Sequence, residues 1–341
     1  MRKKASLVTG ANGEVGHGLI RQLHEAGDKL PVIALDINQV DDEIANLVDD
    51  VVIGDILDTA LLDKLMSEYE IDTIYHLAAL LSTRAEFTPE AAHRVNVQGT
   101  INLLHVAIEQ ARWRGQPVKF LFPSSIAVFG MPDLDAKMDA PPVGEDDYIT
   151  PITMYGCNKV YCEHLGRYYN SHYRQLAQSQ DPHGIDFRCV RYPGLISAVT
   201  LPSGGTSDYG PEMIHAAAKN EPYQAFVRPD TIIPFMAMPD AIKALMLLKE
   251  APETSLTRRV YNITSFSLSA EQIAERVKAA FPQAQIGYEP SPGRQKIVDS
   301  WPARLDDSAA RADWGWSSDF DADAAFNDYL FPAIRQRYQA Q

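Results

Sequence analysis

The sequence predicts an α/β fold: a doubly wound parallel sheet with a smaller C-terminal lobe. Short apolar segments alternate with helical periods through the first half, and these segments are apolar on both faces. Strands buried on both faces are typical of parallel sheets that helices cover. Beyond residue 192 the alternation gives way to loop-like and Pro-rich stretches. The segments expected to be strands are Ala5–Thr9, Pro31–Asp36, Val51–Gly54, Thr73–Ala79, Val118–Ser124 and Ile185–Tyr192.

The intervening segments carry helix signals. Val15, Leu19 and Leu23 recur every four residues and Gly27 follows them, which predicts a helix with one buried stripe. Strand–helix–strand alternation implies right-handed crossovers.

The second half predicts a return to the sheet and a separate lobe. A helix is expected over Pro211–Asn220, a strand at a sheet edge over Val260–Thr264, and another helix beginning after Ser269. We therefore predict a first domain of residues 1–192 that regains chain at about 235–265. The second lobe is expected over 193–234 and 266–341.

Composition limits the partners. The 341 residues carry a formal net charge of −14, which argues against nucleic-acid and anionic-membrane surfaces. No stretch reaches the roughly 18 apolar residues of a membrane span. The three cysteines, Cys157, Cys162 and Cys189, have no metal-type spacing, and the nine histidines suggest no metal site. We interpret the cysteines as reduced thiols of a cytoplasmic protein, with Cys157 as a small filler side chain.

A glycine-rich turn predicts the cofactor site. Gly10, Gly13 and Gly16 follow the first strand and open the first helix. Missing side chains let the backbone approach a pyrophosphate, and the helix N-terminus supplies free N–H donors. Strand and helix flank the motif as in a dinucleotide-binding domain of the Rossmann type, although small-residue turns also serve strand–helix packing. The same turn contributes Asn12, Glu14 and Val15 to the expected cofactor contacts.

Two acidic residues extend this prediction. Asp36 ends the second strand, 20 residues after Gly16, where a carboxylate accepts hydrogen bonds from the ribose hydroxyls and repels a 2′-phosphate. We therefore expect NAD rather than NADP. Asp55 and Ile56 follow the third strand, where the adenine would lie, although Asp55 could equally be a helix N-cap.

A tyrosine and a lysine suggest the reacting centre. Tyr155 and Lys159 are four residues apart, so on a helix they share one face. A phenol has an ordinary pKa near 10, and a neighbouring ammonium favours its deprotonated form. Such a pair is often a plain helix-surface pair. It gains weight from Ser124 and Ser125 at the end of a central strand, where ligands collect in such sheets.

Together these residues resemble the extended short-chain dehydrogenase/reductase superfamily, which includes sugar-nucleotide epimerases and dehydratases. The stretch from His76 through Leu77, Ala78 and Ala79 matches its fourth-strand motif, Asn96 its helix asparagine, and Tyr192-Pro193-Gly194 the loop at the nicotinamide. Within it the chain resembles the epimerase-like L-threonine 3-dehydrogenases, through Gly204–Tyr209, Tyr261–Thr264 and Asp299–Pro302.

The resemblance implies a dehydrogenase that oxidises C3 of L-threonine to 2-amino-3-ketobutyrate with NAD. Tyr155 would be the general base, Lys159 would assist it and hold the nicotinamide ribose, and Ser125 would bind the C3 oxygen. The implied substrate contacts are Leu80, Ser82, Ser124, Ser125, Tyr155, Gly205, Thr206, Ser207 and Trp301. The implied cofactor contacts add Leu77, Ala78, Ala79, Asn96, Tyr192 and Pro193.

Several alternatives stay open. A sugar-nucleotide epimerase or dehydratase, a dehydrogenase of a related hydroxy acid, or a non-catalytic NAD-sensing module would use the same scaffold. Ser207 stands where the family usually has Thr, and Ala237 where it often has Tyr, which affects substrate choice. Thr206 could be a turn residue, and Trp301 could pack the small lobe.

The remaining expectations concern packing and assembly. His76 is expected to be a core histidine rather than a catalyst. The loop around Pro132–Glu145 looks longer than the fold requires. The resemblance implies a homodimer that pairs helices near 91–110 and 156–172.

Overall fold

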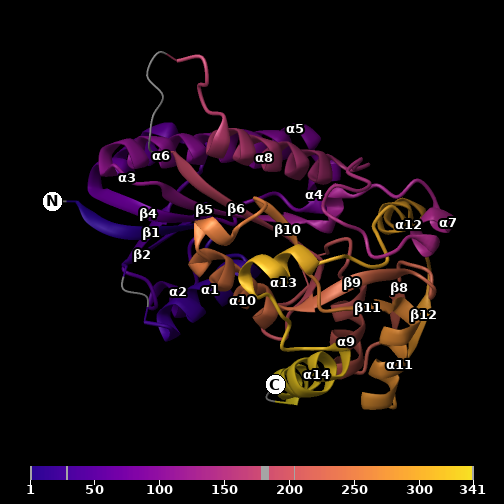
Figure 1. Ribbon diagram of the computed structural model, residues 1–341. Coiled ribbons are helices and arrows are strands. Elements are labelled where there is room, and N and C mark those ends of the chain that lie inside the picture. The colour runs from indigo at the N-terminus through magenta and orange to yellow at the C-terminus, as the bar shows by residue number, and fades with distance from the viewer. Residues whose placement is uncertain (1, 28–29, 178–183, 203, 340–341) are drawn as a thin grey trace. The chain divides into compact units, whose positions relative to one another are not determined.

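A computed structural model describes residues 2–27, 30–177, 184–202 and 204–339 (Figure 1). The chain forms two compact units. The first comprises Met1–Ser124, Asn158–Val190 and Ile242–Tyr261, and the second comprises Ser125–Cys157, Arg191–Ala241 and Asn262–Gln341. The division falls close to the expected limits near 192 and 265, but residues 125–157 group with the second unit. The assignment of cofactor to one part and substrate to the other stays a prediction.

The first unit is built on a seven-stranded sheet of order β10-β6-β5-β4-β1-β2-β3. The strand pairs β1–β2, β1–β4, β2–β3 and β4–β5 are all parallel, which confirms the predicted α/β class. The order reverses between β1 and β4, and ligands in such sheets bind at the carboxyl ends of the strands on either side of that reversal. The strands are β1 (Lys3–Thr9), β2 (Val32–Asp36), β3 (Asp50–Ile53), β4 (Tyr69–His76), β5 (Val118–Ser125), β6 (Ile185–Tyr192) and β10 (Val260–Asn262).

Helices cover both faces of this sheet. In Figure 1, α3, α6 and α8 lie on one face, and α1, α2 and α10 lie on the other. Leu7, Ile33, Ile74 and Phe120 are fully buried between the layers, as strands apolar on both faces require. The bounds are α1 (Glu14–Glu25), α2 (Asp42–Ala45), α3 (Thr59–Glu68), α4 (Ser82–Phe87), α5 (Pro89–His93), η1 (Arg94–Gln98), α6 (Gly99–Arg114), α8 (Met154–Ser171), α10 (Met238–Glu250) and η3 (Glu253–Ser255).

Strand β4 ends three residues earlier than its apolar pattern predicted. The backbone N–H of Leu77 donates to the carbonyl of Thr9, and that of Ala78 donates to the Thr9 hydroxyl. These bonds draw the chain over the end of β1 towards the glycine turn. The apolar pattern continues to Ala79 because these residues are partly buried.

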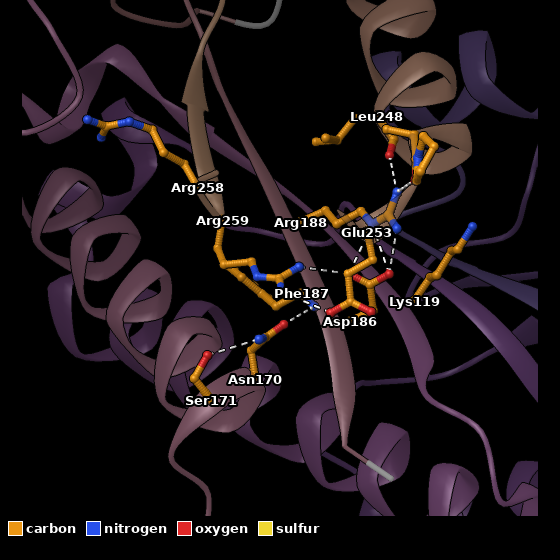
Figure 2. A network of polar contacts seen from close by, with 12 residues as sticks. Lys119, Asn170, Ser171, Asp186, Phe187, Arg188, Leu248, Glu253, Arg258 and Arg259 are labelled. Carbon is orange, nitrogen blue, oxygen red and sulfur yellow. Dashed lines mark hydrogen bonds and ion pairs between the residues drawn. The ribbon is translucent and has the colours of Figure 1, made fainter. Parts of the chain in front are cut away.

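A buried ion-pair network ties β6 to the end of α10 (Figure 2). Arg188 and Asp186 form a bidentate pair with distances of 2.6–3.0 Å, and both side chains are buried. Arg188 also donates to the carbonyls of Leu248, Lys249 and Ala251, which are free because they lie at the helix end. This network fixes the strand that runs on into Tyr192.

The second unit contains a three-stranded sheet, β11-β9-β7, and a parallel two-stranded pair, β12-β8. Ser269 and Gln272 form the capping box of α11, which confirms the helix start expected there. The strands are β7 (Gly194–Ile196), β8 (Tyr223–Ala225), β9 (Ile232–Ala237), β11 (Phe266–Ser269) and β12 (Ile286–Tyr288). The helices are η2 (Ile126–Val128), α7 (Leu134–Asp139), α9 (Tyr209–Lys219), α11 (Ala270–Ala280), α12 (Pro292–Asp299), α13 (Ser308–Trp314), α14 (Ala322–Ala324), η4 (Ala325–Leu330) and α15 (Phe331–Gln339).

Candidate active site

A buried chain of hydrogen bonds fixes the point where the strand order reverses. The Thr9 hydroxyl lies 2.9 Å from Nδ1 of His76, and Nε2 of His76 lies 2.9 Å from the Thr100 hydroxyl. Burial, followed by the charge of Lys159, lowers the pKa of His76 to about 3. His76 is therefore a neutral core histidine that joins β1, β4 and α6, as the sequence suggested.

The glycine turn makes room for a phosphate. Gly10 has φ +68°, and a Cβ there would lie 2.6 Å from the backbone nitrogen of Ala78. A Cβ on Gly16 would lie 2.5 Å from the carbonyl oxygens of Gly10 and Ala11. Gly13 is the N-cap of α1 and provides no side-chain cap. The helix N-terminus therefore keeps donors available for an anion. Glu14 and Val15 follow in the first turn of α1.

Asp36 is held rigidly at the end of β2. Its carboxylate accepts from the backbone N–H of Asn12 at 3.0 Å and of Asn38 at 2.9 Å. The Asn12 side chain is fixed in turn, since its Oδ1 lies 3.0 Å from His17 Nε2 and accepts from the Asp41 N–H. This arrangement presents a carboxylate beside the glycine turn, where a ribose would need it.

Asp55 does not cap a helix. Its Oδ1 accepts from the N–H of Leu57 at 2.9 Å, which makes a local turn, and the N-cap of α3 is Asp58. The alternative that Asp55 is an N-cap is therefore wrong, because the turn delays the helix by three residues. Ile56 is 5% exposed and contacts the position of Gly99, where a Cβ would come within 2.3 Å of its Cδ1.

Asn96 lies in a π-helical turn, η1, and holds the loop after β4. Its side chain accepts from the N–H of Leu80 at 2.8 Å and donates to the carbonyl of Leu80 at 3.0 Å. It also donates to Oδ1 of Asn158, the residue before Lys159. π-Turns often mark functional sites because they redirect one side chain. Asn96 thereby joins the Ala79–Ser82 segment to α8.

Lys159 is fixed against the end of β5. Its ammonium donates to the carbonyl of Pro123 at 2.6 Å and lies 4.4 Å from the centre of the Phe122 ring, and the residue is 5% exposed. Ser124, which follows Pro123 in the chain, is 3% exposed, and its hydroxyl has no hydrogen-bond partner among the described residues. A buried hydroxyl without a partner suits a site that a ligand completes.

In the second unit, the start of α8 is pressed against the segment that follows Ser125. A Cβ on Gly156 would lie 2.0 Å from the carbonyl oxygen of Ala127. Glycine is therefore needed between Tyr155 and Lys159 for α8 to begin here. Ser125 Oγ accepts from the Ala127 N–H at 3.2 Å, which leaves its hydroxyl hydrogen available to donate. Tyr155 is 9% exposed.

The turn after β6 is held in place by a side-chain hydrogen bond and by close packing. The Tyr192 hydroxyl donates to the carbonyl of Ala241 at 2.6 Å within the second unit. Pro193 is buried, and a Cβ on Gly194 would lie 2.8 Å from the Phe235 ring. The expected contact of Tyr192 and Pro193 with a nicotinamide stays a prediction.

The glycine–threonine–serine loop runs directly into α9. The N–H of Gly205 donates to the Asp208 carboxylate at 2.6 Å, and residues 206–208 form a turn. Thr206 is 2% exposed, while Ser207 is half-buried. Tyr209 is fully buried, and its hydroxyl has no partner among the described residues. In the first unit, Ser82 opens α4 and is half-buried.

Two residues that bear on substrate choice are buried in the second unit. Trp301 is 4% exposed, and its backbone N–H donates to the carbonyl of Val298 at 3.2 Å. Ala237 is 0% exposed at the end of β9, opposite Ile196 of β7. The methyl group of Ala237 is therefore fully buried.

Three site-forming features escaped sequence analysis. The first is Gly156, where glycine is required by the carbonyl of Ala127, a residue of another segment. The second is the π-turn at Asn96, since a one-residue insertion leaves the apolar pattern nearly unchanged. The third is Asn158, whose contact with Asn96 joins segments that are 62 residues apart.

The described ranges hold neither a metal-binding cluster nor a membrane-spanning helix. They contain no group of three or more His, Cys, Asp or Glu side chains that could hold a metal ion. No helix in them is long and apolar enough to cross a membrane.

Comparison with known proteins matches nearly the whole chain. The NAD dependent epimerase/dehydratase family matches residues 6–264. The mitochondrial L-threonine 3-dehydrogenase of Bos taurus is 38% identical over 92% of this chain and 79% of its own. The structure of L-threonine dehydrogenase from Clostridium difficile is 36% identical with a TM-score of 0.85, covering 99% of both chains. A monomeric L-threonine 3-dehydrogenase of metagenomic origin is 36% identical with a TM-score of 0.83, covering 98% of this chain and 99% of its own.

The chain therefore belongs to the NAD dependent epimerase/dehydratase family and is an NAD-dependent dehydrogenase.

Proposed function

We propose that the protein oxidises the C3 hydroxyl of L-threonine to a ketone, giving 2-amino-3-ketobutyrate. The observation that carries the proposal is the placement of Lys159, whose ammonium is buried and bonded to Pro123 one helical turn from Tyr155. Relatives that share the whole fold are named L-threonine 3-dehydrogenases, which supports the choice of substrate.

NAD is the cofactor that fits the first unit. Gly10 and Gly16 have no room for a side chain, the N-cap of α1 has no side-chain cap, and the Asp36 carboxylate beside the turn would accept hydrogen bonds from the ribose hydroxyls. NAD⁺, when bound, supplies the acceptor for the hydride that leaves C3. The expected contacts include Gly10, Gly13, Gly16, Asp36 and Asn12, with Asp55, Ile56, Asn96, Tyr192 and Pro193 as further members of that set.

The residues of α8 and the end of β5 provide the proton chemistry. Tyr155 removes the proton of the C3 hydroxyl while the C–H electron pair leaves C3 as hydride. The Lys159 ammonium stabilises the phenolate that this role requires. Ser125 donates its hydroxyl hydrogen to the C3 oxygen while its Oγ accepts from the Ala127 N–H.

The amino-acid end of the substrate needs separate contacts. We assign its carboxylate and ammonium to Ser82, Thr206 and Ser207, to the Gly205 backbone and to the partnerless hydroxyl of Ser124. Trp301 and Leu80 would close the apolar side.

Assembly and compartment are proposed from two exposed tyrosines and from the free cysteines. Tyr161 and Tyr168 are 49% and 40% exposed on α8 and lie seven residues apart on one face. They favour a homodimer through α6 and α8, although one relative is described as monomeric. Sedimentation at micromolar concentration tests this, and a monomer alone would contradict it. The free thiols Cys157, Cys162 and Cys189 favour the cytoplasm.

The test is a substrate panel combined with one substitution. L-Threonine, L-serine, 3-hydroxynorvaline and UDP-galactose are each mixed with NAD⁺ or NADP⁺, and the absorbance of the reduced cofactor is followed. We expect turnover with threonine and NAD⁺, and its loss in Tyr155→Phe with NAD⁺ affinity unchanged within about threefold. Full activity of Tyr155→Phe would refute the assignment of the base. Epimerisation of the sugar nucleotide without net reduction would instead identify an epimerase.

A further inference from the structure

Residues 131–145 form hydrogen bonds with residues 298–306 within the second unit. This is the segment that looks longer than the fold requires. The Met131 N–H donates to the carbonyl of Ser300 at 2.7 Å. Further along, the Val143 N–H donates to the carbonyl of Arg304 at 3.0 Å, and the Asp306 N–H donates back to Val143 at 2.9 Å. In the sequence, Trp301 lies between Ser300 and Arg304, the two residues whose carbonyls accept the first two of these bonds.

Lys137 links α7 to the end of α12 next to Trp301. It is 2% exposed, and its ammonium donates to the carbonyl of Val298 at 2.8 Å. The same carbonyl accepts the backbone N–H of Trp301 at 3.2 Å. Val298 lies in the last turn of α12, where a carbonyl lacks a helical partner and a cation is favoured. The turn that presents Trp301 therefore depends on an oxygen that Lys137 holds.

The charges around this contact explain why a lysine can be buried here. Arg228 forms a bidentate pair with Asp299 at 2.8 and 3.1 Å, and Gln295 donates to the same carboxylate. Burial lowers the pKa of Lys137 to about 8, Asp299 and Asp230 raise it, and Arg228 lowers it. Arg228 and Gln295 engage the Asp299 carboxylate, and the Lys137 ammonium donates to the Val298 carbonyl.

The other end of the same segment leads to the reacting residues. Residues 125–157 are continuous within the second unit and include Ser125 and Tyr155. The Gly130 N–H donates to the carbonyl of Tyr148 at 2.8 Å, which closes the segment at its base. The segment thus joins the chain that carries Ser125 to the turn that carries Trp301.

We propose that Lys137 is a positioning residue that sets the place of Trp301, and through it the binding of the amino-acid substrate. The last step rests on the proposed function, in which Trp301 closes over the substrate. Lys137 itself touches neither substrate nor cofactor.

The test compares Lys137→Met and Lys137→Arg with Lys296→Met. Lys296 is exposed on α12, so its loss removes a lysine from the same region without touching the Val298 carbonyl. We expect Lys137→Met to raise the KM for threonine about tenfold, with kcat and the KM for NAD⁺ changed less than about threefold. Lys137→Arg keeps a donor and a charge and should recover part of the loss, while Lys296→Met should match the wild type. An unchanged KM for threonine in Lys137→Met would overturn the proposal.

A second measurement separates this proposal from the proposed function. Hydrogen–deuterium exchange of the full-length protein without substrate should show faster exchange over 298–306 in Lys137→Met and not in Lys296→Met. If the wild type does not oxidise threonine, the proposed function fails, and the exchange result still decides the role of Lys137. Unchanged exchange over 298–306 would refute it. Faster exchange throughout the chain would also refute it, because Lys137 would then act on global stability.

Discussion

The ammonium of Lys159 donates a hydrogen bond to the carbonyl of Pro123 at 2.6 Å, which fixes α8 against the end of the central strand β5. Pro123 precedes the two serines at the strand end, and Lys159 follows Tyr155 by one helical turn. Lys159, which resembled one half of an ordinary helix-surface pair, is therefore buried and bonded to the carboxyl end of β5, and sheets of this kind bind ligands at the carboxyl ends of their strands.

Removing the charge of Lys159 should reduce catalysis more than stability. Lys159→Met keeps a long, unbranched side chain but leaves the Pro123 carbonyl without its hydrogen-bond donor. It also removes the cation next to Tyr155, the proposed base. We expect kcat with threonine to fall by about 10²-fold or more. Lys278→Met, on the exposed face of α11, is the matched control and should keep full activity. Wild-type kcat in Lys159→Met would contradict the assignment.

Asp36 should determine the choice between NAD and NADP. Asp36→Asn can still accept from a backbone N–H but carries no charge, so the repulsion of a 2′-phosphate disappears. We expect the ratio of kcat/KM for NAD⁺ over NADP⁺ to fall by about tenfold or more. Asp42→Asn, on the nearby exposed helix α2, should leave the ratio unchanged. A constant ratio in Asp36→Asn would show that Asp36 does not face the ribose.

Gly156 should not tolerate a side chain. A Cβ there would lie 2.0 Å from the Ala127 carbonyl, so Gly156→Ala must push the start of α8 away from the segment after Ser125. We expect kcat to fall by about 10²-fold and the free energy of unfolding by about 1–3 kcal/mol. Gly293→Ala, where a Cβ would meet nothing within 4 Å, is the control. Equal activities of the two variants would disprove the close approach.

His76 should make stability fall in acid. Its pKa is lowered to about 3 in the folded protein, whereas in the unfolded chain it is near 6.5. Between these values the unfolded chain binds one proton more, so the free energy of unfolding decreases as the pH falls. Compared with His76→Gln, the wild type should lose about 1.4 kcal/mol more per pH unit between pH 6 and 4. Parallel pH profiles from urea unfolding would contradict a neutral, buried His76.

The sequence predicted the strands and the glycine turn well because both depend on local patterns. Apolar segments identified all six strands expected in the first half, and glycine spacing identified the turn at Gly10. The end of β4 was placed too late, since its limit depends on bonds from Leu77 and Ala78 to Thr9, a residue about 70 positions away.

Long-range contacts also explain what the sequence could not show. The loop around Pro132–Glu145 contains the helix α7, and its role depends on Lys137 reaching Val298, which lies 161 residues later. The site contacts inferred from the family resemblance keep the status of predictions, because their partners are ligands rather than neighbouring side chains.

Reduction of NAD⁺ in the presence of L-threonine is the most direct measurement of the central claim. The wild type should reduce NAD⁺ with L-threonine in preference to L-serine or UDP-galactose, and Tyr155→Phe should not. Turnover of another hydroxy acid or of the sugar nucleotide, with none of threonine, would contradict the account.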